Sequence, residues 1–259
     1  MNRIDQLFQQ KKSGILSIYM TAGYPGLDDT VHIIKYLQKE GVDMVEIGIP
    51  FSDPMADGPV IQVSSQKALK NGMNSDLLFE QLTGIRSEVS IPLIMMGYLN
   101  PILQYGFENF LMNCRKVGID GLIIPDLPPE EYELEYREMC RNFGIHFSML
   151  ITPRTTHERI EKIVALTEGF LYMVADSSTT GPKGSIKDRQ LEYFERVVQM
   201  NLDVPRLIGF GISNYETFKT ACRYADGAII GSAFINAIAD SANLDADIHL
   251  FLRKVRYQK

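Results

Sequence analysis

The stretch that decides the fold is EIGIPFSDPMADGP, residues 46–59. It completes a nearly continuous apolar run over residues 42–49, in which Glu46 stands close to the end. Such a run is typical of a parallel strand that is covered on both faces. An ionised carboxylate is costly to bury unpaired, so Glu46 must find partners or hold a proton at neutral pH. A retained proton is the condition that acid–base catalysis needs.

The alternation of strand and helix recurs along the whole chain. Eight short apolar runs occupy residues 15–21, 44–49, 92–98, 121–126, 146–152, 170–175, 206–211 and 227–232. Helical patterns occupy residues 30–39, 60–70, 75–87, 107–117, 130–142, 156–166, 188–200 and 215–223. Eight such units predict an α/β fold, a single (β/α)8 TIM barrel over residues 1–259. We also expect an extra N-terminal helix over residues 2–10, a last helix over residues 245–255, and a short phosphate-binding helix after the eighth strand.

Composition and charge limit the class of ligand. The formal net charge of −6 argues against a nucleic-acid groove or an anionic membrane surface, so a small-molecule substrate is expected. The cysteines Cys114, Cys140 and Cys222 are widely spaced, which indicates buried free thiols. The four histidines show no ligand spacing, and we predict no metal site. The charged N-terminus and the lack of a long apolar run predict a cytoplasmic protein without membrane contact.

The two carboxylates of the opening stretch each have a structural alternative. Period two aims Glu46 into the barrel mouth if Val45 and Ile47 face the helices, but a strand carboxylate can also pair with an arginine. Asp57 precedes Gly58 and Pro59, where an aspartate can cap a helix or fix a turn. The residues alone leave both alternatives open.

Glycine-rich segments follow the last two apolar runs. Barrel enzymes carry their sites at the C-terminal ends of the strands, and many bind phosphate after strands seven and eight. Glycines there let backbone N–H groups approach an anion. We therefore predict a phosphate site, with an ordinary turn as the alternative, that includes Gly211, Ile212, Ser213, Gly231 and Ser232.

Residues 46–59 closely resemble the signature of the tryptophan synthase alpha subunit, and further matching motifs follow in the expected order. The resemblance implies a carbon–carbon lyase that cleaves indole-3-glycerol phosphate into indole and glyceraldehyde 3-phosphate. It assigns Glu46 to the proton transfers and Asp57 to the indole N–H. None of the eight apolar runs contains a lysine for a Schiff base, so a lyase on this chain needs a substrate that supplies its own electron sink. Indole is such a sink.

The resemblance also implies the remaining substrate contacts. Tyr172 matches the site tyrosine, and Thr180 with Gly181 matches the Thr-Gly pair of the active-site loop, Gly181 near the phosphate. Residues 178–181, Ser-Thr-Thr-Gly, depart from the Gly-Val-Thr-Gly of many members, which bears on loop closure. The residues expected to line an apolar pocket are Tyr19, Met96, Ile123, Ile151 and Phe210. Tyr98 is a further expected substrate contact at a strand end, and Asp126 is one more polar residue at such an end.

A partner is implied as well. Family members work beside a beta subunit that carries pyridoxal phosphate and receives the indole, in an alpha2beta2 heterotetramer, so no cofactor is expected in this chain. The rim that meets the partner would include Pro50, Phe51, Asp53, Pro54, Asn100 and Pro101. Two other classes stay open: a phosphosugar isomerase or epimerase with the same phosphate loops, and a non-catalytic scaffold subunit.

Overall fold

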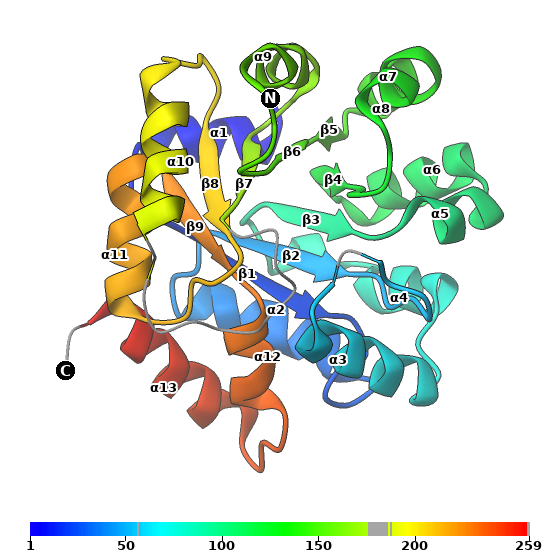
Figure 1. Cartoon of the computed structure of the whole chain (residues 1–259). Helices are drawn as coiled ribbons and strands as arrows, with labels where there is room; N and C mark the ends of the chain where they lie inside the picture. The colour runs from blue at the N-terminus through cyan, green and yellow to red at the C-terminus, as the bar shows by residue number, and fades with distance from the viewer. Residues whose placement is uncertain (56, 176–185, 187, 258–259) are drawn as a thin grey trace.

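The computed structural model describes residues 1–55, 57–175, 186 and 188–257. Within this part of the chain, nine strands form one parallel sheet in the order β5-β4-β3-β2-β1-β9-β8-β7-β6 (Figure 1). The strands are β1 (Ile15–Thr21), β2 (Met44–Gly48), β3 (Leu93–Met96), β4 (Gly121–Ile123), β5 (His146–Phe147), β6 (Leu150–Ile151), β7 (Leu171–Val174), β8 (Arg206–Gly209) and β9 (Gly227–Ile230).

The sheet closes into a barrel through the fifth predicted strand, residues 146–152, which the structure divides into the two short strands β5 and β6. β5 pairs with β4, and β6 pairs with β7. Ser148 and Met149 lie between them; the Ser148 N–H donates to Leu122 O at 3.0 Å, and Met149 O accepts from the Tyr172 N–H at 2.9 Å. One segment of chain therefore turns from one neighbour to the other, and the predicted eight-unit barrel is confirmed.

Helices follow the strands and cover the outside of the sheet (Figure 1). They are α2 (Asp29–Lys39), α3 (Pro59–Lys70), α4 (Ser75–Leu82), α6 (Phe107–Val117), α8 (Arg137–Phe143), α9 (His157–Leu166), α10 (Asp188–Gln199), α11 (Tyr215–Tyr224), α12 (Ser232–Ile238) and α13 (Leu244–Arg256). Helix α1 (Arg3–Gln10) precedes the first strand. The predicted N-terminal helix, the short helix after the last strand and the final helix are all present. No helix in the described residues is long and apolar enough to span a membrane.

The structure differs from the predicted helices in three places. Helix α5 (Leu99–Tyr105) was not predicted, because it is short and contains a proline. The predicted helix over residues 75–87 ends at Leu82, and a 3₁₀ turn (Ile85–Ser87) follows Gly84, whose φ is 80°. The predicted helix over residues 130–142 is α7 (Pro129–Glu131), a π-helical turn (Tyr132–Tyr136) and α8.

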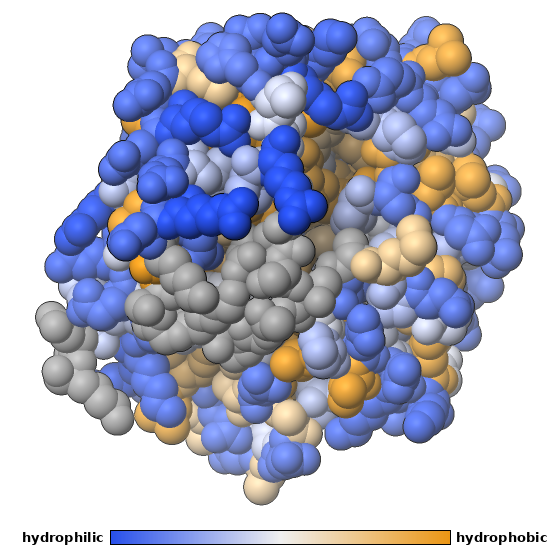
Figure 2. All heavy atoms as spheres, in the orientation of Figure 1, coloured by the Kyte–Doolittle hydropathy of each residue, from blue (hydrophilic) through white to orange (hydrophobic). Residues whose placement is uncertain are grey.

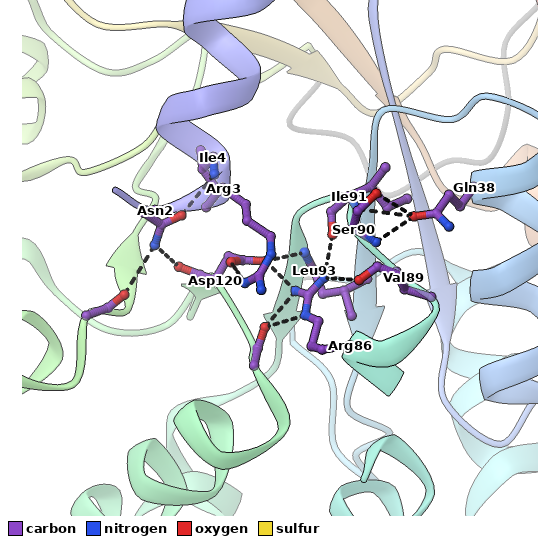
Figure 3. A network of polar contacts seen from close by, with 12 residues as sticks. Asn2, Arg3, Ile4, Gln38, Arg86, Val89, Ser90, Ile91, Leu93 and Asp120 are labelled. Atoms are coloured by element: carbon purple, nitrogen blue, oxygen red, sulfur yellow. Dashed lines mark hydrogen bonds and ion pairs between the residues drawn. The ribbon is translucent and has the colours of Figure 1, made fainter. Parts of the chain in front are cut away.

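The N-terminal helix is fixed to the bottom of the barrel. Ile4 is fully buried, and a Cβ on Gly121 would stand 2.9 Å from its Cδ1. Asp120, which precedes β4, forms an ion pair with Arg3 on this helix and another with Arg86, and accepts from the Leu93 N–H (Figure 3). One buried carboxylate thus ties α1 to the segment before β3.

We predict that Asp120→Ala destabilises the protein by about 3 kcal/mol, because its loss leaves Arg86, which is only 15% exposed, without its carboxylate partner. Urea unfolding followed by circular dichroism measures this change. Glu88→Ala, which removes an exposed ion pair with Lys35, is the control and should barely move the midpoint. Equal effects of the two substitutions would contradict a special role for the Asp120 network.

Candidate active site

Glu46 lies in the middle of β2, and its side chain is fully buried. Its neighbours in register are Tyr19 on β1 and Ile94 on β3. Ser17 Oγ donates to Glu46 Oε1 at 3.1 Å, whereas Oε2 has no hydrogen-bond partner among the described residues. No ion pair reaches Glu46 within that same set, so the arginine-partner alternative does not apply. One oxygen of the carboxyl group is therefore held and the other is left for a ligand.

The protonation state of Glu46 follows from its surroundings. Burial raises the pKa of Glu46 to about 8, against the opposing effect of the Ser17 hydrogen bond. A group with this pKa is mostly protonated at neutral pH. Glu46 is thus a neutral acid that can donate a proton and then take one back.

Asp57 lies in the loop between β2 and α3, half-buried at the mouth. Tyr98 Oη donates to Asp57 Oδ2 at 3.0 Å. Burial raises the pKa of Asp57, and the Tyr98 hydrogen bond opposes the shift. The helix-cap alternative does not hold, because the N-cap of α3 is Gly58 and has no side-chain cap bond.

Two tyrosines complete the wall of the mouth. Tyr19 comes from β1 and Tyr172 from β7, and burial raises the pKa of both hydroxyls, which therefore stay neutral. Tyr19 is the register partner of Glu46, and both carboxyl groups lie close enough to both tyrosines to raise the pKa of their hydroxyls further.

Two glycines make room for these rings. A Cβ on Gly48 would stand 2.1 Å from Tyr19 Oη, and a Cβ on Gly209 would stand 2.2 Å from Tyr172 Oη. Sequence reasoning missed this role of the two glycines, and it also missed Ser17. The available signal was a glycine inside a strand, which marks a close approach.

Apolar residues predicted for the pocket lie at the ends of other strands. Met96 ends β3, Ile123 ends β4 and Ile151 ends β6, and all are buried. Phe210 follows β8 with a φ of 65°, and its ring stands edge-on to Tyr172 at 6.1 Å between centroids. The structure therefore brings residues from many strands to one end of the barrel.

The predicted phosphate segments lie after the adjacent strands β8 and β9. Gly211 has a φ of 84° and open space where a side chain would stand. Ile212 is buried, and the Ser213 N–H donates to Thr217 Oγ1 at 3.0 Å, so that N–H is already used within the chain. Helix α12 begins at Ser232, directly after Gly231, without a side-chain cap bond. Thr180 and Gly181 lie outside the described residues.

The predicted partner rim is formed by two neighbouring segments. Pro50, Phe51, Asp53 and Pro54 lie in the loop after β2, and Asn100 and Pro101 lie in the first turn of α5. The Phe51 and Tyr98 rings join the two segments, with centroids 5.4 Å apart. Asp126 has a structural role here, because its carboxylate accepts from the Leu99 N–H at the start of α5.

The fold and the site define a (β/α)8 barrel that holds two carboxyl groups and a set of aromatic side chains at the C-terminal ends of its strands, where barrel enzymes have their active sites. Comparison with known proteins identifies the family. Residues 5–255 match the family model of the tryptophan synthase alpha chain. The chain therefore belongs to the tryptophan synthase alpha chain family.

Individual relatives agree with the family model. The chain is 55% identical over 242 residues to the tryptophan synthase alpha chain of Parabacteroides distasonis, covering 93% of this chain and 94% of the relative. It is 53% identical over 256 residues to that of Flavobacterium johnsoniae, covering 99% and 100%. A crystal structure of the alpha subunit from Legionella pneumophila superposes with a TM-score of 0.88 at 34% identity, covering 99% of this chain and 97% of that one.

The family fixes the class of activity. The chain is an alpha chain of the tryptophan synthase type, a lyase subunit that cleaves indole-3-glycerol phosphate and carries no cofactor itself. The isomerase or epimerase alternative and the scaffold alternative are thereby excluded. The roles of the individual side chains follow from the geometry.

Proposed function

We propose that Glu46 performs both proton transfers in the cleavage of indole-3-glycerol phosphate and that Asp57 offsets the charge that develops on the indole ring. The observation that carries this proposal is the full burial of Glu46, one of whose carboxyl oxygens has no hydrogen-bond partner among the described residues; the same burial raises its pKa to about 8. A buried acid of this kind is suited to general acid catalysis at neutral pH.

The reaction balances with one carboxyl group. Protonated Glu46 gives its proton to C3 of the indole ring, which leaves a positive charge on the ring nitrogen. The Glu46 carboxylate then takes the proton from the hydroxyl on the adjacent side-chain carbon. The O–H electrons form the aldehyde carbonyl, and the carbon–carbon bond breaks toward the ring and neutralises it. Indole and glyceraldehyde 3-phosphate leave, and Glu46 is protonated again.

Asp57 acts on the ring nitrogen in this scheme. Tyr98 occupies Oδ2 of Asp57, so the other carboxylate oxygen accepts the indole N–H. A fixed negative charge in a site closed to water stabilises the developing cation by an amount that a neutral group cannot match. Tyr19, Tyr172 and Phe210 supply the aromatic walls around the ring, with Met96, Ile123 and Ile151 behind them.

We predict that Glu46→Gln folds normally but releases indole at least about 10²-fold more slowly, because an amide cannot exchange the proton. In the unsubstituted protein, kcat/KM should fall as pH rises through about 8, since Glu46 must start protonated. Colorimetric detection of indole measures both. Near-normal turnover by Glu46→Gln would remove Glu46 from the chemistry.

We predict that Asp57→Asn is about as damaging as Asp57→Ala, because both remove the negative charge. Single-turnover indole release measures the chemical step, with Glu88→Gln as a control for the loss of an exposed carboxylate. The role fails if Asn keeps full activity, since the amide retains the hydrogen-bond acceptor without the charge.

The substrate phosphate is proposed to bind after β8 and β9. Gly211 and Ile212 offer backbone N–H groups there, as do Gly231 and Ser232 at the start of α12. Ser213 is proposed to contact the same phosphate, and its N–H also donates to Thr217 Oγ1. Thr180 is proposed to contact the substrate and Gly181 its phosphate, although both lie outside the described residues.

We predict that Gly211→Ala raises KM about tenfold with a smaller effect on kcat, because a Cβ at positive φ distorts the backbone donors. Gly72→Ala is the matched control, since Gly72 also has a positive φ and open space but lies between α3 and α4. A KM change shared by both variants would place the phosphate elsewhere. Steady-state kinetics with indole-3-glycerol phosphate measures it.

A beta subunit is the partner expected for this family, and a crystal structure of the tryptophan synthase complex from Pyrococcus furiosus superposes with a TM-score of 0.86 at 32% identity. We propose that it docks on the rim formed by Pro50, Phe51, Asp53, Pro54, Asn100 and Pro101. Met55 beside this rim is 82% exposed, and Leu134 after α7 is 81% exposed. Figure 2 shows hydrophobic side chains on this side of the molecule, where Figure 1 places α5, α6 and α7.

The assembly and its setting are proposed on the same basis. Exposed apolar side chains near a polar rim favour a protein interface. We propose an alpha2beta2 heterotetramer in the cytoplasm, with pyridoxal phosphate on the beta subunit and indole passed between the subunits.

We predict that Asp53→Ala keeps the basal rate of indole release and loses stimulation by added beta subunit. Asp53 is exposed in the loop that leads to Asp57, and the Ser52 hydroxyl is its hydrogen-bond donor. The measurement is the ratio of rates with and without beta subunit, and Glu88→Ala is the control at the other end of the barrel. Unchanged stimulation of the Asp53 variant would refute the coupling role.

A further inference from the structure

We propose that Ser17 is a positioning residue, whose hydroxyl fixes Oε1 of Glu46 so that Oε2 carries the proton that reaches the substrate. The inference rests on the proposed catalytic role of Glu46. It assigns different tasks to the two oxygens of one carboxyl group.

The geometry supports this division. Ser17 and Glu46 lie on the paired strands β1 and β2, and both side chains are fully buried. Ser17 Oγ stands 3.1 Å from Oε1, and Oε2 has no partner among the described residues. In a protonated carboxyl group, one oxygen bears the hydrogen and the other is the carbonyl acceptor. Because Ser17 donates to Oε1, Oε1 takes the carbonyl part and the hydrogen stands on Oε2.

The same bond acts after the proton has left. A hydrogen bond to an ionised oxygen is shorter and stronger than one to a neutral oxygen. Ser17 therefore stabilises the Glu46 carboxylate during the interval between its two proton transfers. Burial alone would disfavour that anion strongly.

The other groups that face Glu46 give no such help. They are Tyr19 from β1, Tyr172 from β7 and Asp57 from the loop after β2, and Ile94 is its neighbour on β3. The two tyrosines stay neutral, and neither has a hydrogen bond to Glu46 among the described residues, whereas an ionised Asp57 would repel the carboxylate. The Ser17 hydroxyl is the interaction that lowers the pKa of Glu46, against the effect of burial.

The sequence around Ser17 supports a functional reason for the hydroxyl. Strand β1 is buried over its whole length, and Ser17 stands between Leu16 and Ile18. An apolar side chain at this position would avoid the cost of burying a hydroxyl. A serine there is explained by the carboxyl group that it meets.

The test compares Ser17→Thr with Ser17→Val, which have nearly the same shape and differ in the hydroxyl. The Thr variant should keep kcat within about threefold. The Val variant should lose about tenfold or more in kcat with little change in KM. Its alkaline limb of kcat/KM should move to higher pH, because the Glu46 anion has lost its donor and the pKa of Glu46 rises further.

An infrared titration gives a second readout without turnover. The carbonyl stretch of protonated Glu46 is identified by its absence in Glu46→Gln, and it should persist to higher pH in the Val variant than in the Thr variant. If the added methyl group prevents folding of both, Ser17→Ala, which adds no bulk, takes the place of the Val variant and should show the same shift relative to the unsubstituted protein.

Ser148→Ala is the matched control for the loss of a buried hydroxyl. Ser148 is also fully buried in the barrel wall, but its Oγ donates to Glu168 O at 3.3 Å. The Ser148→Ala substitution should leave the pH dependence of kcat/KM and the infrared titration of Glu46 unchanged. If Glu46→Gln is inactive but the pH profile of the Ser17→Val or Ser17→Ala variant does not shift, the role of Ser17 is refuted and that of Glu46 is not. An active Glu46→Gln would instead overturn the proposed catalytic role of Glu46.

Discussion

Burial of one carboxyl group in the wall of a parallel barrel is the constraint on which this site depends. Glu46 lies between β1 and β3, where its charge is not balanced by any cation among the described residues. Burial raises the pKa of Glu46 to about 8, so the acid is mostly neutral at pH 7. A glutamate on an exposed loop would be ionised at neutral pH and could not protonate a carbon atom. In the proposed scheme, the buried position in the strand is what makes Glu46 a proton donor at neutral pH.

The two carboxyl groups of the mouth have different environments and suit different tasks. Glu46 is fully buried on a strand, whereas Asp57 is half-buried on a loop with a tyrosine hydroxyl as its donor. Burial raises both pKa values, that of Glu46 to about 8, and a hydroxyl donor opposes the shift at each group. In the proposed scheme, Glu46 moves protons and Asp57 remains ionised.

Much of the fold could be predicted because a strand buried on both faces is apolar throughout, and that pattern occurs eight times in the sequence. The break in the fifth strand at Ser148 could not be predicted, because it arises where the chain changes its pairing partner from β4 to β7, and such a change leaves no local signal in the sequence. Helix α5 is short and contains Pro101, so propensity opposed it.

Less of the site than of the fold could be predicted from the sequence. A motif singled out Glu46 and Asp57, but the residues alone did not decide between catalysis and a structural role. Gly48 and Ser17 act through contacts across strands, with Tyr19 and Glu46 respectively. Such contacts depend on register, which a single sequence does not specify. The only signals in the sequence were a glycine inside a strand, for Gly48, and a serine between aliphatic residues, for Ser17.

The supports of the two carboxyl groups suggest how a partner could act on the chemistry. Glu46 is fixed by strands on both sides, so a protein at the rim has little means to move it. Asp57 accepts a hydrogen bond from Tyr98, whose ring lies tilted against that of Phe51. Tyr98 directly precedes α5, and the Leu99 N–H at the start of α5 donates to Asp126. A force applied to α5 or to the loop after β2 therefore reaches Asp57 through contacts that the structure contains. In the proposed assembly, the beta subunit would set the distance between the carboxylates by moving Asp57 toward a fixed Glu46, and the gain in rate would be bounded by how rarely the isolated chain adopts that arrangement.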